Sequence, residues 1–274
     1  MIKGSKLLLD KNCPMCHIYG KCFEKTGLID EDTIIYYQVV DEEVFEKVDP
    51  VKAKSEVAFF NERTGKTYYG VKAFLHILSH NNKFLKWFLN TSIMFFIAEK
   101  TYRFISYNRQ VMAGRYIDPS ERDCSPSYRL SYRLSYIILI ALSTGLILNH
   151  FTFILDAGEG KFYNPYTEYI VAFGQIAWQF IAIQFINKKK RLDYLGNMST
   201  VSFVGGLLLL PLFVFNALGA LNPFQLLLYF SIVVFAMFIM HIKRTKNLGL
   251  PFSITVSWLV YRLIALGTIL LLTI

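Results

Sequence analysis

Apolar residues are distributed unevenly along the chain. From about residue 134 onward, five long apolar runs are separated by short segments rich in glycine, proline or asparagine. Each run is long enough to cross ~30 Å of hydrocarbon at ~1.5 Å per residue. The runs predict spans at about residues 134–155, 166–187, 200–220, 223–242 and 252–274. The second half is therefore expected to be an all-α polytopic membrane domain of about five transmembrane helices.

The first half has shorter elements. Short apolar or alternating stretches at residues 6–10, 33–39, 56–61 and 67–69 are typical of strands. Helices are expected at residues 14–25, 42–48 and 70–79. This order predicts a small α/β thioredoxin-like N-terminal domain. The apolar stretch at residues 84–98 is too short to span, so we expect it to pack on this domain or lie on the bilayer surface.

These patterns predict three regions. Residues 1–115 form the α/β domain, residues 116–133 a basic juxtamembrane linker, and residues 134–274 the membrane domain. The N-terminus leads directly into the first strand without a long apolar core, so no cleaved signal peptide is expected.

Charge predicts the orientation of the spans. Twelve bases lie before the first span and in alternate loops, and the two other loops have one. The twelve are Arg109, Arg115, Arg122, Arg129, Arg133, Lys188, Lys189, Lys190, Arg191, Lys243, Arg244 and Lys246, and the one is Lys161. The positive-inside rule then predicts a multi-pass protein of the cell (inner) membrane, with a cytoplasmic N-terminal domain and the C-terminus on the opposite side. Residues 1–130 carry 19 Lys and Arg against 16 Asp and Glu, so membrane lipid is an expected partner and nucleic acid is not.

Two cysteines stand where the first strand meets the first helix. Cys13 and Cys16 are separated by two residues, so they can form a disulfide with little backbone movement. The amide groups and dipole of a helix N-terminus favour a thiolate on the first cysteine. We therefore expect Cys13 to be the nucleophile and Cys16 the resolving thiol. Pro14 fixes φ for a first helical turn and stiffens the motif.

Four other residues are weaker candidates. Asp10 is placed to handle a proton for Cys16, and His17 to lower a thiol pKa with its positive charge. Cys22 is expected to be a buried small apolar residue. Cys124, just before the first span, is either a relay thiol or an incidental exposed one. A structural or metal-binding pair remains an alternative, although zinc needs four ligands; no resident metal is expected.

Arg262 lies near the middle of the last predicted span. A charge at that depth costs ~2.5–3.5 kcal/mol on insertion scales, so Arg262 is a candidate intramembrane site. The alternative is a structural partner such as Glu168, Gln175 or Gln179. The redox pair itself needs no cofactor; a quinone is a speculative addition, and no second close cysteine pair follows in the sequence to complete a transmembrane relay.

Three segments carry a resemblance to a known family. They are residues 9–16 (Leu-Asp-Lys-Asn-Cys-Pro-Met-Cys), 69–73 (Tyr-Gly-Val-Lys-Ala) and 102–109 (Tyr-Arg-Phe-Ile-Ser-Tyr-Asn-Arg). In this order they resemble the DCC-type thiol-disulfide oxidoreductases, also called the DUF393 domain. The chain departs from the shortest members by its spans, and from thioredoxin by lacking a proline directly before the third strand.

The resemblance implies a thioredoxin-like fold in which Cys13 and Cys16 exchange thiols and disulfides. It predicts a membrane-anchored thiol-disulfide oxidoreductase whose partner is a disulfide-bearing protein or a membrane redox protein. Two alternatives remain open. One is a non-enzymatic membrane assembly or transport subunit with a docking domain, and the other is a protein that handles metal through the cysteine pair.

Overall fold

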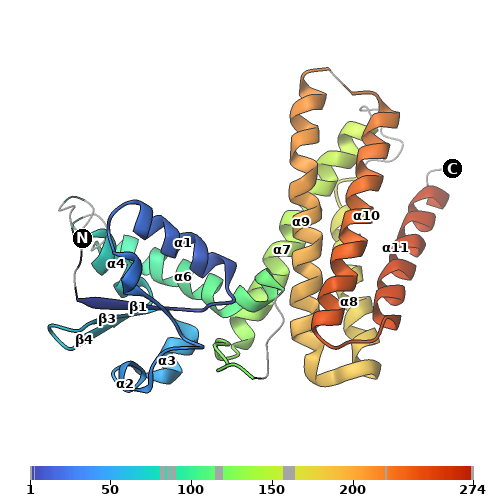
Figure 1. Cartoon of the computed structure of the whole chain (residues 1–274). Helices are drawn as coiled ribbons and strands as arrows, with labels where there is room; N and C mark the ends of the chain where they lie inside the picture. The colour runs from blue at the N-terminus through green and yellow to red at the C-terminus, as the bar shows by residue number, and fades with distance from the viewer. Residues whose placement is uncertain are drawn as a thin grey trace. The chain divides into compact units, whose positions relative to one another are not determined.

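A computed structural model describes residues 2, 4–80, 84, 87, 91–114, 120–156, 164–219 and 221–272. The chain divides into two compact units, Met1–Tyr132 and Arg133–Ile274 (Figure 1).

The first unit is built on a mixed four-stranded sheet. The strands are β1 (Ser5–Leu9), β2 (Ile34–Tyr36), β3 (Ala58–Asn61) and β4 (Lys66–Tyr69), in the order β2-β1-β3-β4. Strand β1 is parallel to β2 and antiparallel to β3, and β4 is antiparallel to β3. In this register Leu7 lies opposite both Ile34 and Phe59. The α/β fold class expected for this half is confirmed.

Helices cover both faces of the sheet. They are α1 (Pro14–Lys25), η1 (Glu31–Thr33), α2 (Glu42–Phe45), α3 (Pro50–Ser55), α4 (Val71–Leu78) and α6 (Ser92–Ala113). Figure 1 shows α1, α4 and α6 on one face, with α2 and α3 on the other. Alternation along β1 explains the two cores, because Leu7 and Leu9 pack against α1 and α4 while Leu8 packs in a second cluster with Val40 and Ala53.

Two glycines allow close packing around this sheet. A Cβ on Gly20 of α1 would lie 2.9 Å from Leu9 Cδ1, so the absence of a side chain lets α1 approach β1 closely. Gly70 precedes α4 at a φ of +57°, in the left-handed region that favours glycine. Both glycines therefore help to position α1 and α4 beside the cysteine motif.

The segment before α7 packs against the sheet within the first unit. Cys124 is buried in the cluster around Leu8, and the Ser127 hydroxyl lies 2.8 Å from that of Ser55. The expectation of an exposed thiol at Cys124 is therefore wrong. The reason is tertiary packing over more than 70 residues of sequence, which local composition does not reveal. Of the apolar stretch at residues 84–98, Phe84 and Trp87 are helical and exposed, and residues 85–86 and 88–90 lie outside the described ones.

The second unit is all-helical, as expected. Its helices are α7 (Leu130–Leu155), α8 (Thr167–Asn187), η2 (Lys188–Lys190), α9 (Arg191–Ala217), α10 (Pro223–Asn247) and α11 (Ser253–Leu272), with the first turn of α7 contributed by the end of the first unit. Among the described residues, four helical stretches are long and apolar enough to cross a membrane. One of them, Thr167–Ala217, has 51 residues and contains α8, η2 and α9. This agrees with the predicted membrane domain of about five helices.

Polar side chains join these helices. The Tyr194 hydroxyl of α9 donates to Gln179 Oε1 of α8 at 2.8 Å and lies 3.2 Å from His241 Nε2 of α10. The other ring nitrogen of His241 lies 3.1 Å from the Thr255 hydroxyl of α11. Hydrogen bonds of this kind between helices are common in membrane domains, since unpaired polar groups are costly in lipid.

Several of the bases used to predict orientation lie within helices, and Arg109, Arg133 and Arg244 are buried. Arg109 lies in α6 and is buried in the first unit. Arg133 lies in α7, is buried, and pairs with Asp193 at 3.3 Å. Arg115 and Lys161 lie outside the described residues. The charge asymmetry therefore rests on Arg122, Arg129 and the two basic clusters at the ends of the later helices.

Candidate redox site

The cysteine pair lies where β1 passes into α1. Cys13 is the N-cap residue of α1, and Pro14 is its first residue. The Cys13 N–H donates to the carbonyl of Asp10 at 3.2 Å, which closes the turn between strand and helix. Both thiols are free, and Cys13 and Cys16 are only 2% and 1% exposed. The local sequence thus places two buried thiols at the amino end of a helix.

The two thiols have different acidities. The pKa of Cys13 is lowered to about 6, first by a hydrogen bond from the Cys16 side chain, with further lowering by the Cys16 backbone N–H and by Arg109. Burial and the Asp10 carboxylate act in the opposite direction. The pKa of Cys16 is raised far above its usual value, first by the same hydrogen bond and then by burial. A thiolate is therefore favoured on Cys13 and disfavoured on Cys16.

Tyr19 completes the arrangement on α1. Its hydroxyl donates a hydrogen bond to Cys16 Sγ at 2.7 Å. Burial raises the pKa of Tyr19 well above its usual value, so this hydroxyl keeps its proton. Because Tyr19 follows Cys16 by three residues, the two side chains lie on the same face of the helix.

Arg109 brings a positive charge to the site from α6. Its guanidinium lies 3.6 Å from Asp10 Oδ2 and donates to the carbonyl of Lys54 at 2.7 Å. It also donates to the carbonyl of Cys124 and lies 3.4 Å from Cys124 Sγ. A guanidinium stays protonated in proteins, so this buried cation is permanent. It lowers the pKa of both Cys13 and Cys16.

Asp10 is held in place by several partners. Its carboxylate accepts from Gln38 Nε2 at 2.7 Å and from the Asn12 N–H at 3.1 Å, in addition to the pair with Arg109. The Gln38 side-chain oxygen in turn accepts the Lys11 N–H at 3.0 Å. These contacts order the loop before Cys13. The structure thus places Asp10 as a buried partner of Arg109 rather than as a surface carboxylate.

His17 and Pro14 lie beside the pair without facing its cavity. His17 Nε2 is 2.5 Å from the carbonyl of Lys11, and its ring centroid is 5.7 Å from that of Tyr36. Pro14 is exposed at the first turn of α1, where its missing N–H leaves no donor unpaired.

A cavity of about 340 Å³ opens beside the two thiols. Its lining is Cys13, Met15, Cys16, Ile18, Tyr19, Phe74, Tyr102, Ile105, Ser106 and Arg109. The lining is mainly apolar, and the volume lies at the lower end of the ~300–1,000 Å³ typical of ligand pockets. Ile18 on its rim is 68% exposed, so the cavity is reached from the surface.

The other predicted site residues are placed elsewhere. Cys22 is exposed on α1, so the expectation that it is buried is wrong. Cys124 touches Arg109 from the opposite core, and Arg262 belongs to the second unit. Within the described ranges, no three His, Cys, Asp or Glu side chains lie close enough together to hold a metal ion.

Sequence reasoning did not single out Arg109, Tyr19 or Gln38 as site residues. Two of the three had a detectable signal. Arg109 ends the third resembling segment, and Tyr19 lies one helical turn after Cys16. Gln38 contacts Asp10 across 28 residues, and no local pattern indicates that pairing.

Comparison with known proteins agrees with the geometry of this site. Residues 7–115 match the model of the family described as DCC1-like thiol-disulfide oxidoreductase. This is less than half of the chain, and it contains both cysteines and Arg109. Neither curated proteins nor solved structures gave a match. Over residues 7–115 the chain is therefore similar to the DCC1-like thiol-disulfide oxidoreductase family.

Proposed function

We propose that the chain is a membrane-anchored thiol-disulfide oxidoreductase in which Cys13 is the nucleophile and Cys16 the resolving thiol. The unequal acidity of the two thiols carries this proposal. At pH 7 a thiol with a pKa of about 6 is mostly thiolate, which is the form that attacks a disulfide. The cavity beside the pair supplies a place for the substrate.

The first step is attack of the Cys13 thiolate on one sulfur of a substrate disulfide. The substrate S–S bond breaks, a mixed disulfide forms with Cys13, and the second substrate sulfur leaves as a thiolate. Cys16 then attacks the Cys13 sulfur. The substrate departs as a dithiol, and a Cys13–Cys16 disulfide remains, so two electrons pass from the protein to the substrate.

The first step itself activates Cys16. The Cys13 thiolate raises the pKa of Cys16 through its hydrogen bond and its negative charge. Both causes disappear when Cys13 enters the mixed disulfide. Burial still opposes ionisation, but Arg109 and Tyr19 remain, and both lower the pKa of Cys16. The resolving thiol therefore becomes nucleophilic only after the substrate has been captured.

The chemistry of the cavity suggests the substrate. Met15, Ile18 and Phe74 favour an apolar group next to the disulfide, as in a protein or membrane partner whose cysteine has apolar neighbours. In a reducing compartment the pair would rest as a dithiol and act as a reductant. A second dithiol, such as a small redox protein or a thiol buffer, would then reduce the Cys13–Cys16 disulfide.

We further propose that the N-terminal domain is cytoplasmic and that the protein resides in the cell (inner) membrane, with the C-terminus on the opposite side. Lys188, Lys189 and Lys190 join α8 to α9, and Lys243 and Lys246 lie in the last two turns of α10. Bases so placed stay on the cytoplasmic side. Reporter fusions after residues 190 and 274 test this proposal. It requires a cytoplasmic reporter at the first site and an external one at the second.

A redox titration of the full chain in detergent tests the enzymatic proposal. We expect Cys13 and Cys16 to form a reversible two-electron couple at roughly −120 to −270 mV, the range of known oxidoreductases. Peptide mass spectrometry after alkylation identifies the paired sulfurs. Cys16→Ser should trap a mixed disulfide with a partner, whereas Cys22→Ser should behave as the parent does. Failure of Cys13 and Cys16 to pair at any potential would contradict the proposal.

A further inference from the structure

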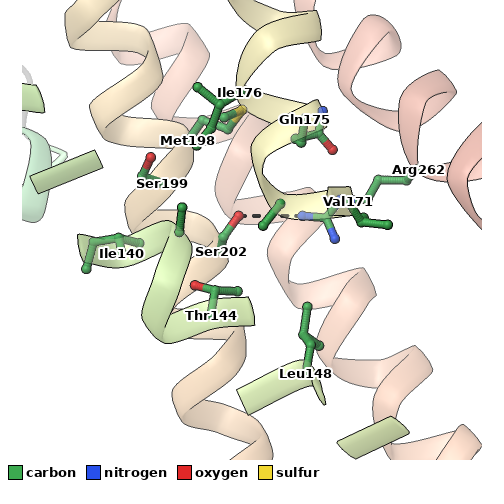
Figure 2. A pocket seen from close by; sticks show the side chains of 12 residues that line it. Ile140, Thr144, Leu148, Val171, Gln175, Ile176, Met198, Ser199, Ser202 and Arg262 are labelled. Carbon is green, nitrogen blue, oxygen red and sulfur yellow. Dashed lines mark hydrogen bonds between the residues drawn. The ribbon is translucent and has the colours of Figure 1, made fainter. Parts of the chain in front are cut away.

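The second unit contains a small polar cavity among its helices. Its volume is about 30 Å³, and it is lined by residues of α7, α8, α9 and α11. In Figure 2, Ser202 and the end of Arg262 face each other across the centre, with Thr144 below them and Gln175 above. A second cavity of about 20 Å³ shares Thr144, Leu148, Ser202 and Arg262 with the first.

Several polar side chains at this cavity are buried without a hydrogen-bond partner. They are Thr144 Oγ1, Ser199 Oγ and both amide atoms of Gln175. The three residues are 5%, 4% and 2% exposed, respectively. An unpaired hydroxyl or amide costs free energy in an apolar setting, and the cost is greatest where no water can reach it. Their gathering at one cavity points to a bound group that uses them.

Arg262 adds a positive charge without a matching ion pair. Its guanidinium donates to Ser202 Oγ at 3.5 Å and lies 5.1 Å from the centre of the Trp258 ring, and its Nε has no partner. No carboxylate of the described residues lies close enough to the Arg262 guanidinium to form an ion pair. Glu168 acts on Arg262 electrostatically, but Glu168 Oε1 accepts the Thr152 hydroxyl at 2.8 Å. Glu168 is therefore a counter-charge without direct contact, and the cavity leaves room for an anion beside the guanidinium.

We propose that this cavity binds a small inorganic monovalent anion of the chloride type, held by Arg262 and by hydrogen-bond donors of Thr144, Gln175 and Ser199. An anion neutralises the guanidinium and also accepts hydrogen bonds from the unpaired donors. This site uses none of the cysteines. The inference is therefore independent of the proposed thiol chemistry.

Size distinguishes this ligand from larger ones. One water needs ~10–15 Å³ of such volume, so the cavity holds one or two particles of that size. Pockets for organic cofactors have volumes of ~300–1,000 Å³, which excludes a quinone ring from this cavity. The positive charge of Arg262 excludes a cation. Water alone would fill the space but would leave Arg262 without an anion in direct contact.

Trp258 provides a direct probe because Arg262 lies over its ring. In full-length protein carrying Trp87→Phe and Trp178→Phe, Trp258 is the remaining tryptophan. We expect iodide to quench its fluorescence saturably, chloride to compete with iodide, and gluconate, which is too large for the cavity, to have no effect. Arg262→Gln should abolish the saturable component. Lys243→Gln removes an exposed base outside the cavity and should leave it unchanged.

Two milder variants keep the test decisive if Arg262→Gln does not fold. Thr144→Val and Ser199→Ala retain the cation and remove one hydroxyl each, and each should weaken iodide binding by ~2–10-fold, as expected for one hydrogen bond. Quenching that rises linearly with iodide and is insensitive to chloride would overturn the proposal. So would saturable quenching that is the same in the parent, Thr144→Val and Ser199→Ala proteins.

Discussion

The hydrogen bond between the two thiols is the largest cause of the low pKa of Cys13. Replacing Cys16 by alanine removes this donor, so the pKa of Cys13 should rise toward its ordinary value of 9.0. Cys16→Ser keeps a hydroxyl donor at the same position and should preserve part of the lowering. The pair of variants separates the hydrogen bond from the other effects of removing a thiol.

The size of the effect follows from two opposing terms. At pH 7 a pKa of about 6 leaves ~90% of Cys13 as thiolate, against ~1% at the ordinary 9.0. The intrinsic nucleophilicity of a thiolate falls as its pKa falls, with a Brønsted coefficient of ~0.4–0.5. This loss offsets the gain in thiolate fraction by ~20-fold. If the whole lowering is lost, attack on a disulfide slows by ~4-fold at pH 7 and by ~40-fold at pH 5. Above about pH 8 the variant becomes the faster protein, because its thiolate is the more basic.

The assay is the initial rate of reaction of Cys13 with a small aromatic disulfide between pH 5 and pH 10. All proteins carry Cys22→Ser, because Cys22 is exposed and would react as well. The rate profiles of the parent and Cys16→Ala should cross, with that of Cys16→Ser between them. If both variants follow the parent profile, the hydrogen bond does not set the reactivity of Cys13. A parent midpoint near pH 9 would refute the lowering itself.

Two further predictions concern the cysteine pair, and a third concerns helix packing in the second unit. Below about pH 6, oxidation of the pair releases two protons, so its reduction potential should fall by ~59 mV per pH unit. Above about pH 6, oxidation releases one proton, and the potential should fall by ~30 mV per pH unit. A single slope throughout would contradict the low pKa of Cys13. Tyr19→Phe removes the hydrogen bond to Cys16 and should prolong the mixed disulfide by ~2–10-fold, as quenched mass spectrometry would show, while initial attack keeps its rate. Gly205→Val should lower the thermal unfolding temperature, because a Cβ there would overlap the Met237 side chain of α10, whereas Gly267→Val has open space and tests the cost of valine alone.

Local patterns predicted the parts of the site that local sequence determines. The apolar run before the cysteines predicted a strand at residues 6–10, and the helix predicted at residues 14–25 matches α1, with Cys13 at its start. The burial of Cys22 was predicted incorrectly. Cys22 follows Cys16 by six residues, and the rotation of the helix over that distance turns its side chain well away from that of Cys16.

Long-range pairing explains what the sequence did not reveal. The predicted third span begins at residue 200, whereas α9 begins at Arg191. Its first turns are polar, and hydropathy excludes them, but Asp193 pairs with Arg133 at 3.3 Å and Asn197 accepts from Arg244 at 2.9 Å. These pairs let a polar segment continue the helix among its neighbours.

Residues beyond the family match complete the environment of Cys13. The match ends at residue 115, yet Glu121 accepts from Lys11 and Asn12 at 3.0 Å each, in the loop that leads to Cys13. Arg109 donates to the carbonyl of Cys124, which helps to hold the guanidinium that lowers both thiol pKa values. A chain that ended at residue 115 would keep both cysteines and lose these supports. The reactivity of the pair is therefore a property of the whole first unit, including the segment that leads into α7.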